Sequence, residues 1–447
     1  MEINMKTVKI DKNKILGKIR DLNGVGGGPL TSNFTCDATE LFKEARIPFS
    51  RTHDIEYPYG SGEFVDIHCV FPDFKADADD PESYNFVLTD AYLKAILDAG
   101  AKPFYRLGAT IEHQPIKRHI FPPADSEKWG RICSHIIAHY NEGWANGFHM
   151  NIEYWEIWNE PDLKDRCWTG TQEQFFCLYD AASKIIKAEH PNIKLGGCGF
   201  TNPRSKMVER FLDHISKSGA PLDFLSWHGY IHSPKQAIAL SEYADELMKK
   251  YGYDNAESIY NEWNYVFTWG NGLIQKSINE HKTALGASFV SSVMTVLQKG
   301  RTDKAMYYDV QINMPNWNGV FHKGDMITHG EPFVITPEKP YYALKSWGML
   351  KDLGNEVYSE SDNDDVFVAA AADDKELRVL ITYYNDDDGL GRSKPPRDSI
   401  KIDLGGLEYN NAEVRIVDND RNFEPEALEN GTVVLDGNSF ALVTFKL

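Results

Sequence analysis

Short apolar segments alternate with longer amphipathic segments between about residues 20 and 350. The short segments are rich in β-branched and aromatic residues and predict strands at 20–25, 49–54, 103–109, 154–160, 194–200, 224–230, 258–263 and 305–311. In the longer segments apolar residues recur at three- and four-residue steps, which predicts helices at 37–47, 88–101, 126–147, 171–190, 205–219, 235–252, 281–300 and 340–354. This alternation predicts an α/β fold, the (β/α)8 TIM barrel, whose active sites lie at the carboxyl ends of the strands. A doubly wound open sheet is the competing fold, but no GxGxxG or GxxxxGK[ST] run follows any predicted strand.

The pattern changes after about residue 352. The segments there are short and β-branched, Asn, Asp and Gly separate them, and no helical periodicity lies between them. They predict an accessory antiparallel β-sandwich, and the strand-like run KTVKID at 6–11 is expected to join it. The expected domains are therefore a catalytic barrel over residues 15–351 and a β-sandwich domain made of residues 1–14 and 352–447.

Composition and charge favour a soluble globular enzyme. Hydrophobic residues make up 42% of the 447 residues, enough for a large core, and the net charge of −19 argues against nucleic acid or an anionic membrane as a partner. The six cysteines are scattered without CxxC spacing, which fits a reducing compartment and argues against a zinc site or a disulfide framework. The first residues lack the apolar core of a secretory signal, so a cytoplasmic location is expected, with a trimmed secreted form left open.

Carboxylates interrupt the apolar run YWEIWNEPDL at 154–163. On a strand Glu156 and Glu160 share one face, and Pro161 ends the strand because it has no N–H to donate. Glu160 is therefore expected where the strand meets its loop. Glu156 lies deeper, and since a buried carboxylate needs a cation, Arg51 on the second predicted strand is its candidate partner.

A further carboxylate, Glu262, lies near the end of another predicted strand, in the run SIYNEWNY at 258–265. A barrel brings the ends of its strands to one rim, so Glu160 and Glu262 are expected to face each other there. Two such carboxyls are the minimum for breaking a glycosidic bond, because one protonates the leaving oxygen and the other attacks or directs water. A separation of about 5–5.5 Å implies a covalent intermediate and retention, and about 6.5–9.5 Å implies inversion.

Short runs near the ends of most predicted strands carry a family resemblance. They are RTH at 51–53, GAKPF at 100–104, WEIWNEP at 155–161, LGG at 195–197, DFLSWHGY at 223–230, NEWN at 261–264 and KPYYA at 339–343. Together they make the chain resemble glycoside hydrolase family 39 over nearly its full length. This family belongs to the retaining (β/α)8 glycosidase clan and includes β-xylosidases and α-L-iduronidases.

The resemblance implies roles for four polar residues. Glu160 would be the general acid/base and Glu262 the nucleophile. Asn159 would hold the sugar 2-hydroxyl beside the nucleophile, a contact that strengthens in the transition state. Glu160 must keep a proton at neutral pH, which a partly desolvated pocket would favour, and a hydrogen bond from Tyr230 would hold Glu262 ionised.

The resemblance also implies a set of sugar-binding side chains. His53, His228 and Tyr230 would line the subsite that grips the non-reducing sugar. Trp263 and Trp317 are candidates for an apolar platform under the sugar ring, although core packing explains them equally well. No HExxH or His-x-His pair occurs, so neither a catalytic metal nor a cofactor is expected.

The eighth predicted strand departs from the family pattern. In the xylosidases of the family it brings an acidic pair in a Ser-Asp-x-Phe-Glu-Glu run that helps to bind sugar hydroxyls, whereas this chain reads MYYDVQ at 306–311. Asp309 is the one acid left in that run, so it is the candidate for hydroxyl binding and xylose is not assumed. Arg106 is expected either to meet a carboxylated sugar or to pair with Glu156.

The sequence thus predicts a retaining, exo-acting, β-xylosidase-like glycoside hydrolase that removes a terminal non-reducing sugar by double displacement. The alternatives are a glycosidase of the same fold for arabinose, galactose or a uronic acid, a transglycosylase, and a non-catalytic carbohydrate-binding barrel. The expected partner is a glycoside or oligosaccharide substrate, with no nucleic acid and no membrane. The oligomeric state, a homo-oligomer included, stays open.

Overall fold

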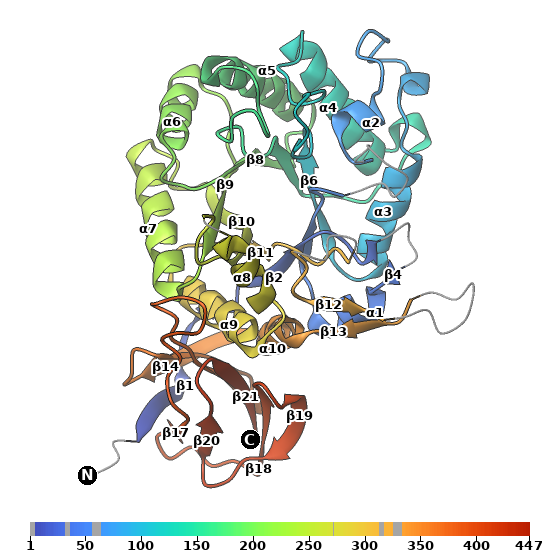
Figure 1. Ribbon diagram of the computed structural model, residues 1–447. Coiled ribbons are helices and arrows are strands. Elements are labelled where there is room, and N and C mark those ends of the chain that lie inside the picture. The colour runs from blue at the N-terminus through green and yellow to red at the C-terminus, as the bar shows by residue number, and fades with distance from the viewer. Residues whose placement is uncertain (1–4, 32–35, 56–63, 271, 313–316, 325–332) are drawn as a thin grey trace.

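Two domains make up the protein, and the computed structural model describes residues 5–31, 36–55, 64–270, 272–312, 317–324 and 333–447 of it. Eight strands close into a barrel in the order β10-β11-β2-β5-β6-β7-β8-β9, and helices surround it (Figure 1). A nine-stranded sheet forms the second domain and lies against one side of the barrel (Figure 1). The predicted TIM barrel with an accessory β domain is confirmed.

The barrel strands fall on the eight segments that the sequence pattern predicts. They are β2 (Asp21–Gly26), β5 (Phe49–Arg51), β6 (Lys102–Leu107), β7 (Tyr154–Ile157), β8 (Lys194–Phe200), β9 (Phe224–Ile231), β10 (Glu257–Tyr265) and β11 (Lys304–Tyr307). Every neighbouring pair is parallel. The strands are almost entirely buried, because helices cover the outside of the barrel and side chains fill the inside.

A helix lies on each of the eight segments predicted to be helical. These helices are α1 (Thr39–Ala45), α3 (Val87–Asp98), α4 (Ser126–Asn141), α5 (Gln172–Glu189), α6 (Lys206–Ser218), α7 (Pro234–Lys250), α9 (Ala284–Lys299) and α10 (Lys339–Leu353). Capping boxes at Thr171 and Ser233 start α5 and α7, and Gly219 ends α6 in the left-handed conformation. Two additional helices, α2 (Ile67–Val70) and α8 (Leu273–Glu280), lie in loops after the strands. None of the helices in the described ranges is long and apolar enough to cross a membrane.

The second domain is one mixed sheet that curls on itself (Figure 1). Its strands run in the order β19-β18-β21-β16-β15-β14-β1-β17-β20, with bounds β1 (Lys6–Lys18), β14 (Asn355–Ser361), β15 (Val366–Ala372), β16 (Glu376–Tyr383), β17 (Asp398–Asp403), β18 (Asn411–Val417), β19 (Asn422–Ala427), β20 (Thr432–Leu435) and β21 (Ser439–Lys446). The pair β1 and β17 is parallel, and the other neighbours are antiparallel. An apolar cluster that includes Val368, Val379 and Val443 forms the core of this domain.

The N-terminal strand extends further into the second domain than the sequence suggested. β1 continues to Lys18, and Ile15, Gly17 and Lys18 pair with residues of β14. Residues 15–18, which were assigned to the barrel, therefore lie in the sheet. Most of this part of β1 is exposed, so no apolar alternation marks it in the sequence. Residues 1–4 lie outside the described residues.

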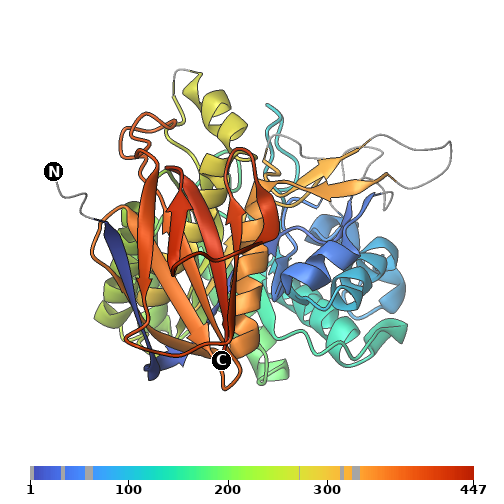
Figure 2. The same ribbon diagram turned by 90° about the horizontal axis from the view of Figure 1, so that it is seen from below.

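The two domains share a packed interface. The sheet strands β15, β16 and β21 contact α9, and β15 and β16 also contact α10, which Figure 2 shows beside the sheet. Ser291 on α9 lies 2.6 Å from the Thr382 hydroxyl on β16. A loop after β16 reaches the barrel, where Tyr265 at the end of β10 donates a hydrogen bond to Asp386 over 2.6 Å. The second domain therefore buttresses the strand that carries Glu262.

Candidate active site

Inside the barrel, a polar layer of side chains lies nearer the carboxyl ends of the strands than an apolar layer does. The apolar layer consists of Phe49, Phe104, Tyr154, Phe224, Ile259 and Met306. Residues two positions further along a strand point to the same face. Those positions hold Arg51, Arg106, Glu156, Ser226 and Asn261. The polar layer therefore lies where a barrel enzyme has its active site.

Glu156 is a fully buried carboxylate whose oxygens are well satisfied. Arg51 Nε donates to its Oε2 over 2.8 Å, and Ser226 Oγ and Asn261 Nδ2 donate to its Oε1 over 2.5 and 2.6 Å. Such partners are what a charge removed from water requires. The predicted pairing of Glu156 with Arg51 is confirmed.

Arg51 also contacts the two strand ends that carry Glu160 and Glu262. Its Nη1 donates to Glu262 Oε2 over 3.1 Å, and its Nη2 donates to Asn159 Oδ1 over 2.6 Å. A guanidinium group has donors only, so Asn159 turns its amide oxygen to Arg51 and keeps its NH₂ group for another acceptor. The positive charge beside Glu262 favours the ionised form of that carboxyl.

Glu160 lies just beyond the end of β7, in a backbone conformation that few residues adopt. Trp158 and Glu160 have φ values of 72° and 44°, in the left-handed region. The Glu160 N–H donates to the carbonyl of Gly199 on β8 over 2.9 Å and so holds this turn. Left-handed conformations of residues other than glycine are typical of functional positions.

The carboxyl group of Glu160 is almost enclosed. Its side chain contacts His228, whose Nδ1 lies 2.8 Å from Oε1, and Cys167, whose Sγ lies 3.8 Å from Oε2. Burial raises the pKa of Glu160 to about 8, with a further contribution from the negative charge of Asp162. Burial also lowers the pKa of His228 to about 4. At pH 7 Glu160 therefore holds a proton beside a neutral imidazole, the state that a general acid needs.

Glu262 on β10 faces Glu160. One oxygen of each carboxyl and a ring nitrogen of His228 all lie within 4.8 Å of one another. Tyr230 donates a hydrogen bond to Oε1 of Glu262, as predicted, while Arg51 donates to Oε2. Burial and the neighbouring Glu160 raise the pKa of Glu262, and the Arg51 guanidinium offsets only part of this, so the net shift is upward. The hydrogen bonds from Tyr230 and Arg51 favour the carboxylate form that a nucleophile requires.

The same three side chains form a group that could also ligate a metal ion. Imidazole nitrogen and carboxylate oxygen are common zinc ligands, and three of them converge here. A metal ion bound there would occupy the oxygens of Glu160 and Glu262 and the Nδ1 of His228. Such an ion would therefore compete with substrate.

Asp54 is a further carboxyl of this group that the sequence analysis did not single out. It follows His53 at the end of β5 and is 5% exposed, close to the 8% of Glu160 and the 6% of Glu262. Tyr308 donates to its Oδ2 over 2.7 Å, and His53 Nε2 lies 3.1 Å from its Oδ1. The sequence indicated Asp54 only through its position as the last residue of the predicted strand 49–54.

His53 and Asp309 lie around Asp54 rather than beside Glu160. The Nδ1 of His53 accepts a hydrogen bond from Arg106 Nε over 3.2 Å, and burial lowers the pKa of this histidine well below its usual value. Asp309, after β11, is fully buried, and burial raises its pKa well above the usual range, with added repulsion from Asp54 and Glu262. Both residues thus belong to the polar group at the carboxyl ends of the strands.

Aromatic side chains cover the Glu262 side of this group. The ring centroid of Trp317 lies 5.3 Å from that of Tyr230, and the ring of Trp269 lies 5.2 Å from Tyr230 on another side. Trp269 is 58% exposed, which is unusual for a tryptophan. Sequence analysis missed Trp269 because it lies in the loop after β10, outside every quoted motif. An exposed aromatic beside paired carboxyls is suited to stacking on a sugar or a leaving group.

Trp263 does not reach this group. The register between β9 and β10 shifts between Tyr260 and Glu262, so the strand carries an irregularity there. This shift turns Glu262 inward next to Asn261 and sends Trp263 outward, where its ring packs 6.0 Å from Phe289 of α9. Trp263 is 0% exposed, so the expectation that it lines the sugar platform is wrong and its role is core packing.

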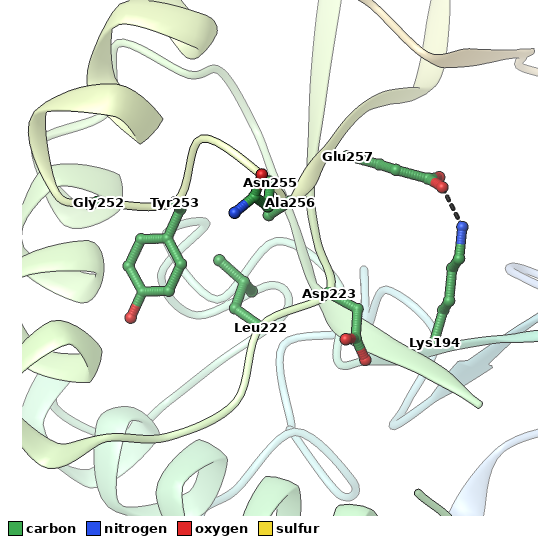
Figure 3. A pocket seen from close by; sticks show the side chains of 8 residues that line it. All are labelled: Lys194, Leu222, Asp223, Gly252, Tyr253, Asn255, Ala256 and Glu257. Atoms are coloured by element: carbon green, nitrogen blue, oxygen red, sulfur yellow. Dashed lines mark hydrogen bonds and ion pairs between the residues drawn. The ribbon is translucent and has the colours of Figure 1, made fainter. Parts of the chain in front are cut away.

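A separate cavity of about 270 Å³ opens at the opposite end of the barrel, at the amino ends of β8, β9 and β10. Figure 3 shows its lining, in which the ammonium group of Lys194 pairs with the carboxylate of Glu257. Asp223 pairs with Lys187 over 2.9 Å and also accepts the N–H of Leu195. The charges here are paired with each other, which is typical of a structural end of a barrel.

The fold and the facing carboxyls together define a class of protein, the glycoside hydrolases. A (β/α)8 barrel that presents two carboxyls within 4.8 Å at the carboxyl ends of its strands has the equipment for cleaving a glycosidic bond. The chain belongs to the glycosyl hydrolases family 39, whose family model matches residues 6–268. The family resemblance of the sequence is confirmed, and the protein is a glycoside hydrolase.

Similar proteins act on different sugars, as their names state. A β-xylosidase from Caldicellulosiruptor saccharolyticus is 26% identical over 73% of this chain and 68% of its own length. An α-L-iduronidase from Mus musculus is 25% identical over 62% of this chain and 47% of its own length. The crystal structure of a glucosidase from Croceicoccus marinus superposes with a TM-score of 0.77 at 19% identity, covering 99% of both chains. These comparisons give the family and the fold but no single sugar.

Proposed function

We propose that this protein is a retaining, exo-acting glycoside hydrolase that removes a terminal non-reducing sugar by double displacement. The observation that carries the proposal is the approach of a Glu160 oxygen and a Glu262 oxygen to within 4.8 Å. This upper limit on one oxygen–oxygen distance favours the closer of the two arrangements, about 5–5.5 Å, over the separation of about 6.5–9.5 Å that makes room for a water molecule. The names of the related β-xylosidase and α-L-iduronidase support action on a single terminal sugar.

In the first step Glu262 attacks the anomeric carbon. The glycosidic C–O bond breaks, and the leaving oxygen takes the proton of Glu160, so a glycosyl ester of Glu262 and a free alcohol result. The raised pKa of Glu160, about 8, keeps that proton available at neutral pH. Arg51 holds the amide oxygen of Asn159. The NH₂ group of Asn159 is then placed to donate to the sugar 2-hydroxyl or to the hydroxyl on a neighbouring ring carbon.

In the second step Glu160, now ionised, takes a proton from water as that water attacks the anomeric carbon. The ester bond to Glu262 breaks, the carboxylate returns to the hydrogen bonds from Tyr230 and Arg51, and the product keeps its anomeric configuration. His228 stays neutral throughout and accepts or donates a single hydrogen bond at Nδ1, since burial lowers its pKa to about 4.

A screen of 4-nitrophenyl glycosides with NMR of the first-formed anomer tests the proposal. Cleavage of at least one pentoside or hexoside with retention is expected. An inverted first product would contradict the double displacement, and failure to cleave any pentoside, hexoside or uronide would favour a carbohydrate-binding barrel.

Replacement of the nucleophile gives the sharper test. Glu262→Ala should lower kcat/KM by at least about a thousandfold, because the ester can no longer form. External azide should restore part of the rate and yield a glycosyl azide of opposite anomeric configuration. Activity close to wild type would remove Glu262 from this role. The control is Glu257→Ala, a carboxyl on the same strand at the far end of the barrel.

A further inference from the structure

Asp54 stands out because the two-step reaction does not use it, although it is as accessible as the catalytic pair. Its carboxyl accepts hydrogen bonds from Tyr308 OH at 2.7 Å and from the Ile111 N–H at 3.4 Å, and His53 Nε2 lies 3.1 Å from its Oδ1. A carboxylate offers about four acceptor positions, so capacity for a further hydroxyl remains. Asp54 also lies close to the Glu262 side of the site, because the ring of Tyr308, its donor, lies 6.4 Å from the ring of Tyr230, which donates to Glu262.

A chain of polar contacts runs from Asp66 through Arg106 to the His53 ring beside Asp54. Asp66 pairs with Arg106 Nη2, and Arg106 Nε donates to His53 Nδ1 over 3.2 Å. Since Nδ1 of His53 accepts, the proton of the neutral ring lies on Nε2, the atom that is 3.1 Å from Asp54 Oδ1. The His53 N–H therefore lies beside the Asp54 carboxyl, which keeps acceptor capacity for a further hydroxyl.

Arg106 is the feature that would favour a carboxylated sugar, and its surroundings oppose that role. Its Nη1 has no hydrogen-bond partner among the described residues, but the whole side chain is 0% exposed. Its charge is already matched by Asp66, and His53 stands between it and Asp54. The expectation that Arg106 pairs with Glu156 is wrong, because Arg51 holds that position.

The carboxyl groups around the reaction centre outnumber the cations that could pair with them. Asp54 and Asp309 add to Glu160 and Glu262, and Arg51 is shared between Glu156 and Glu262. A carboxylate on the sugar would be buried here without a cation of its own, because Arg51 and Arg106 are already paired with protein carboxylates. Hydroxyl groups, in contrast, can donate to Asp54.

We propose that Asp54 is a specificity-determining residue that accepts a hydrogen bond from a hydroxyl of the bound sugar and, with Asp309 behind it, excludes uronic acids. The substrate class is then a terminal neutral sugar, a pentose or an uncharged hexose. This inference rests on the proposed function, because it places the sugar between Glu160 and Glu262.

A matched pair of substrates tests it: 4-nitrophenyl β-D-glucoside and 4-nitrophenyl β-D-glucuronide, which differ only in the group at C5, with the β-D-xyloside as a third. Wild type should cleave one of the neutral glycosides with a kcat/KM at least about a hundredfold above that for the glucuronide. Asp54→Asn should lower kcat/KM on the neutral sugar roughly 10- to 100-fold, as expected for losing a hydrogen bond to a charged group. The neutral-to-uronide ratio should fall with it.

Two further variants keep the test decisive. Tyr308→Phe removes the hydroxyl that holds Asp54 and is expected to reduce the same ratio, although more weakly. This variant serves as the test if Asp54→Asn folds poorly. Asp223→Asn, at the opposite end of the barrel, is the control and should leave the ratio unchanged. The inference is overturned by a wild-type enzyme that prefers the glucuronide, or by an Asp54→Asn variant with an unaltered ratio.

Failure of the proposed function gives a different result. If wild type cleaves none of the glycosides, saturation-transfer NMR with xylose, glucose and glucuronate measures binding instead. Binding of a neutral sugar that Asp54→Asn weakens, without binding of glucuronate, would support the recognition role of Asp54 in a barrel that does not hydrolyse. Binding of glucuronate in preference would contradict it.

Discussion

The two ends of the barrel carry similar kinds of charged side chains but pair them differently. At the amino ends of the strands Glu257 lies between Lys194 and Lys304 and also accepts from Tyr154 OH. Burial raises the pKa of Glu257, but the two lysines outweigh it and the net shift is downward. This carboxylate is therefore kept ionised by its partners and is held in a structural role.

At the carboxyl ends of the strands, burial outweighs the effect of the neighbouring cations on the pKa values of the acids. Burial raises the pKa of Glu160 to about 8 and that of Asp54 to about 7, and it also raises the pKa of Asp309 well above its usual range. Arg51 is shared by two carboxylates, and Arg106 is committed to Asp66. An excess of buried acids over cations is costly, and barrels accept such a cost where chemistry takes place.

The largest effect is expected from removing the cation that the carboxyl end depends on. Arg51→Met would leave Glu156 and Glu262 buried without their common partner, so the free energy of unfolding should fall by about 3–5 kcal/mol. Activity should be lost as well, since Glu262 loses the donor that favours its ionised form. Urea unfolding followed by circular dichroism, with kcat/KM on an aryl glycoside, measures both. A stable and active Arg51→Met enzyme would contradict the assignment of Arg51 as the shared partner.

A smaller but diagnostic effect concerns pH. Because Glu160 must be protonated to act as the acid and its pKa is about 8, kcat/KM should fall about tenfold per pH unit above that value. It should be steady below pH 8 only down to the pKa of Glu262, which must be ionised to attack. In Glu160→Ala this basic limb should disappear for activated leaving groups, which need no proton. Glycosides with poor leaving groups should hardly be cleaved by this variant. Equal losses on both kinds of substrate would count against Glu160 as the acid.

The same pKa predicts how stability depends on pH. The folded protein holds the Glu160 proton up to about pH 8, whereas the unfolded chain releases it near 4.5. The native state then binds more protons between these values, so this group's contribution to the free energy of unfolding decreases as pH rises through that window. Glu160→Gln should make the decrease shallower in urea unfolding measured from pH 5 to 8.

Periodicity of the apolar residues was enough to predict the barrel and its rim. Strand and helix patterns each have their own period, so all eight strands, and the strand ends that carry Glu160 and Glu262, could be placed from the sequence. The need of Glu156 for a cation followed from burial, because a carboxylate within a barrel needs one, but burial alone did not choose between Arg51 and Arg106. These predictions needed only the types of residues and their spacing along the sequence.

Register and loop geometry could not be predicted in this way. The register shift in β10 reverses the faces of Glu262 and Trp263, and strict alternation along the strand gives no sign of it. Asp54 gains its importance from Tyr308 and the Arg106 relay, which come from other strands. β1 extends to Lys18 through backbone pairing that leaves its side chains exposed. Each of these features depends on neighbours distant in the chain.

The smallest effect is expected at the amino end, where charges are matched. Lys194→Met, the counterpart of Arg51→Met, leaves Glu257 with Lys304 and the Tyr154 hydroxyl. The Lys194 side chain is 35% exposed, so solvent screens its pair with Glu257 and the loss in the free energy of unfolding should not exceed about 1 kcal/mol. The same urea and kcat/KM measurements should show activity within about twofold of wild type, because no charge near Glu160 or Glu262 has changed. A tenfold loss of activity in Lys194→Met would mean that the two ends are coupled and that charge pairing does not separate structure from catalysis in this barrel.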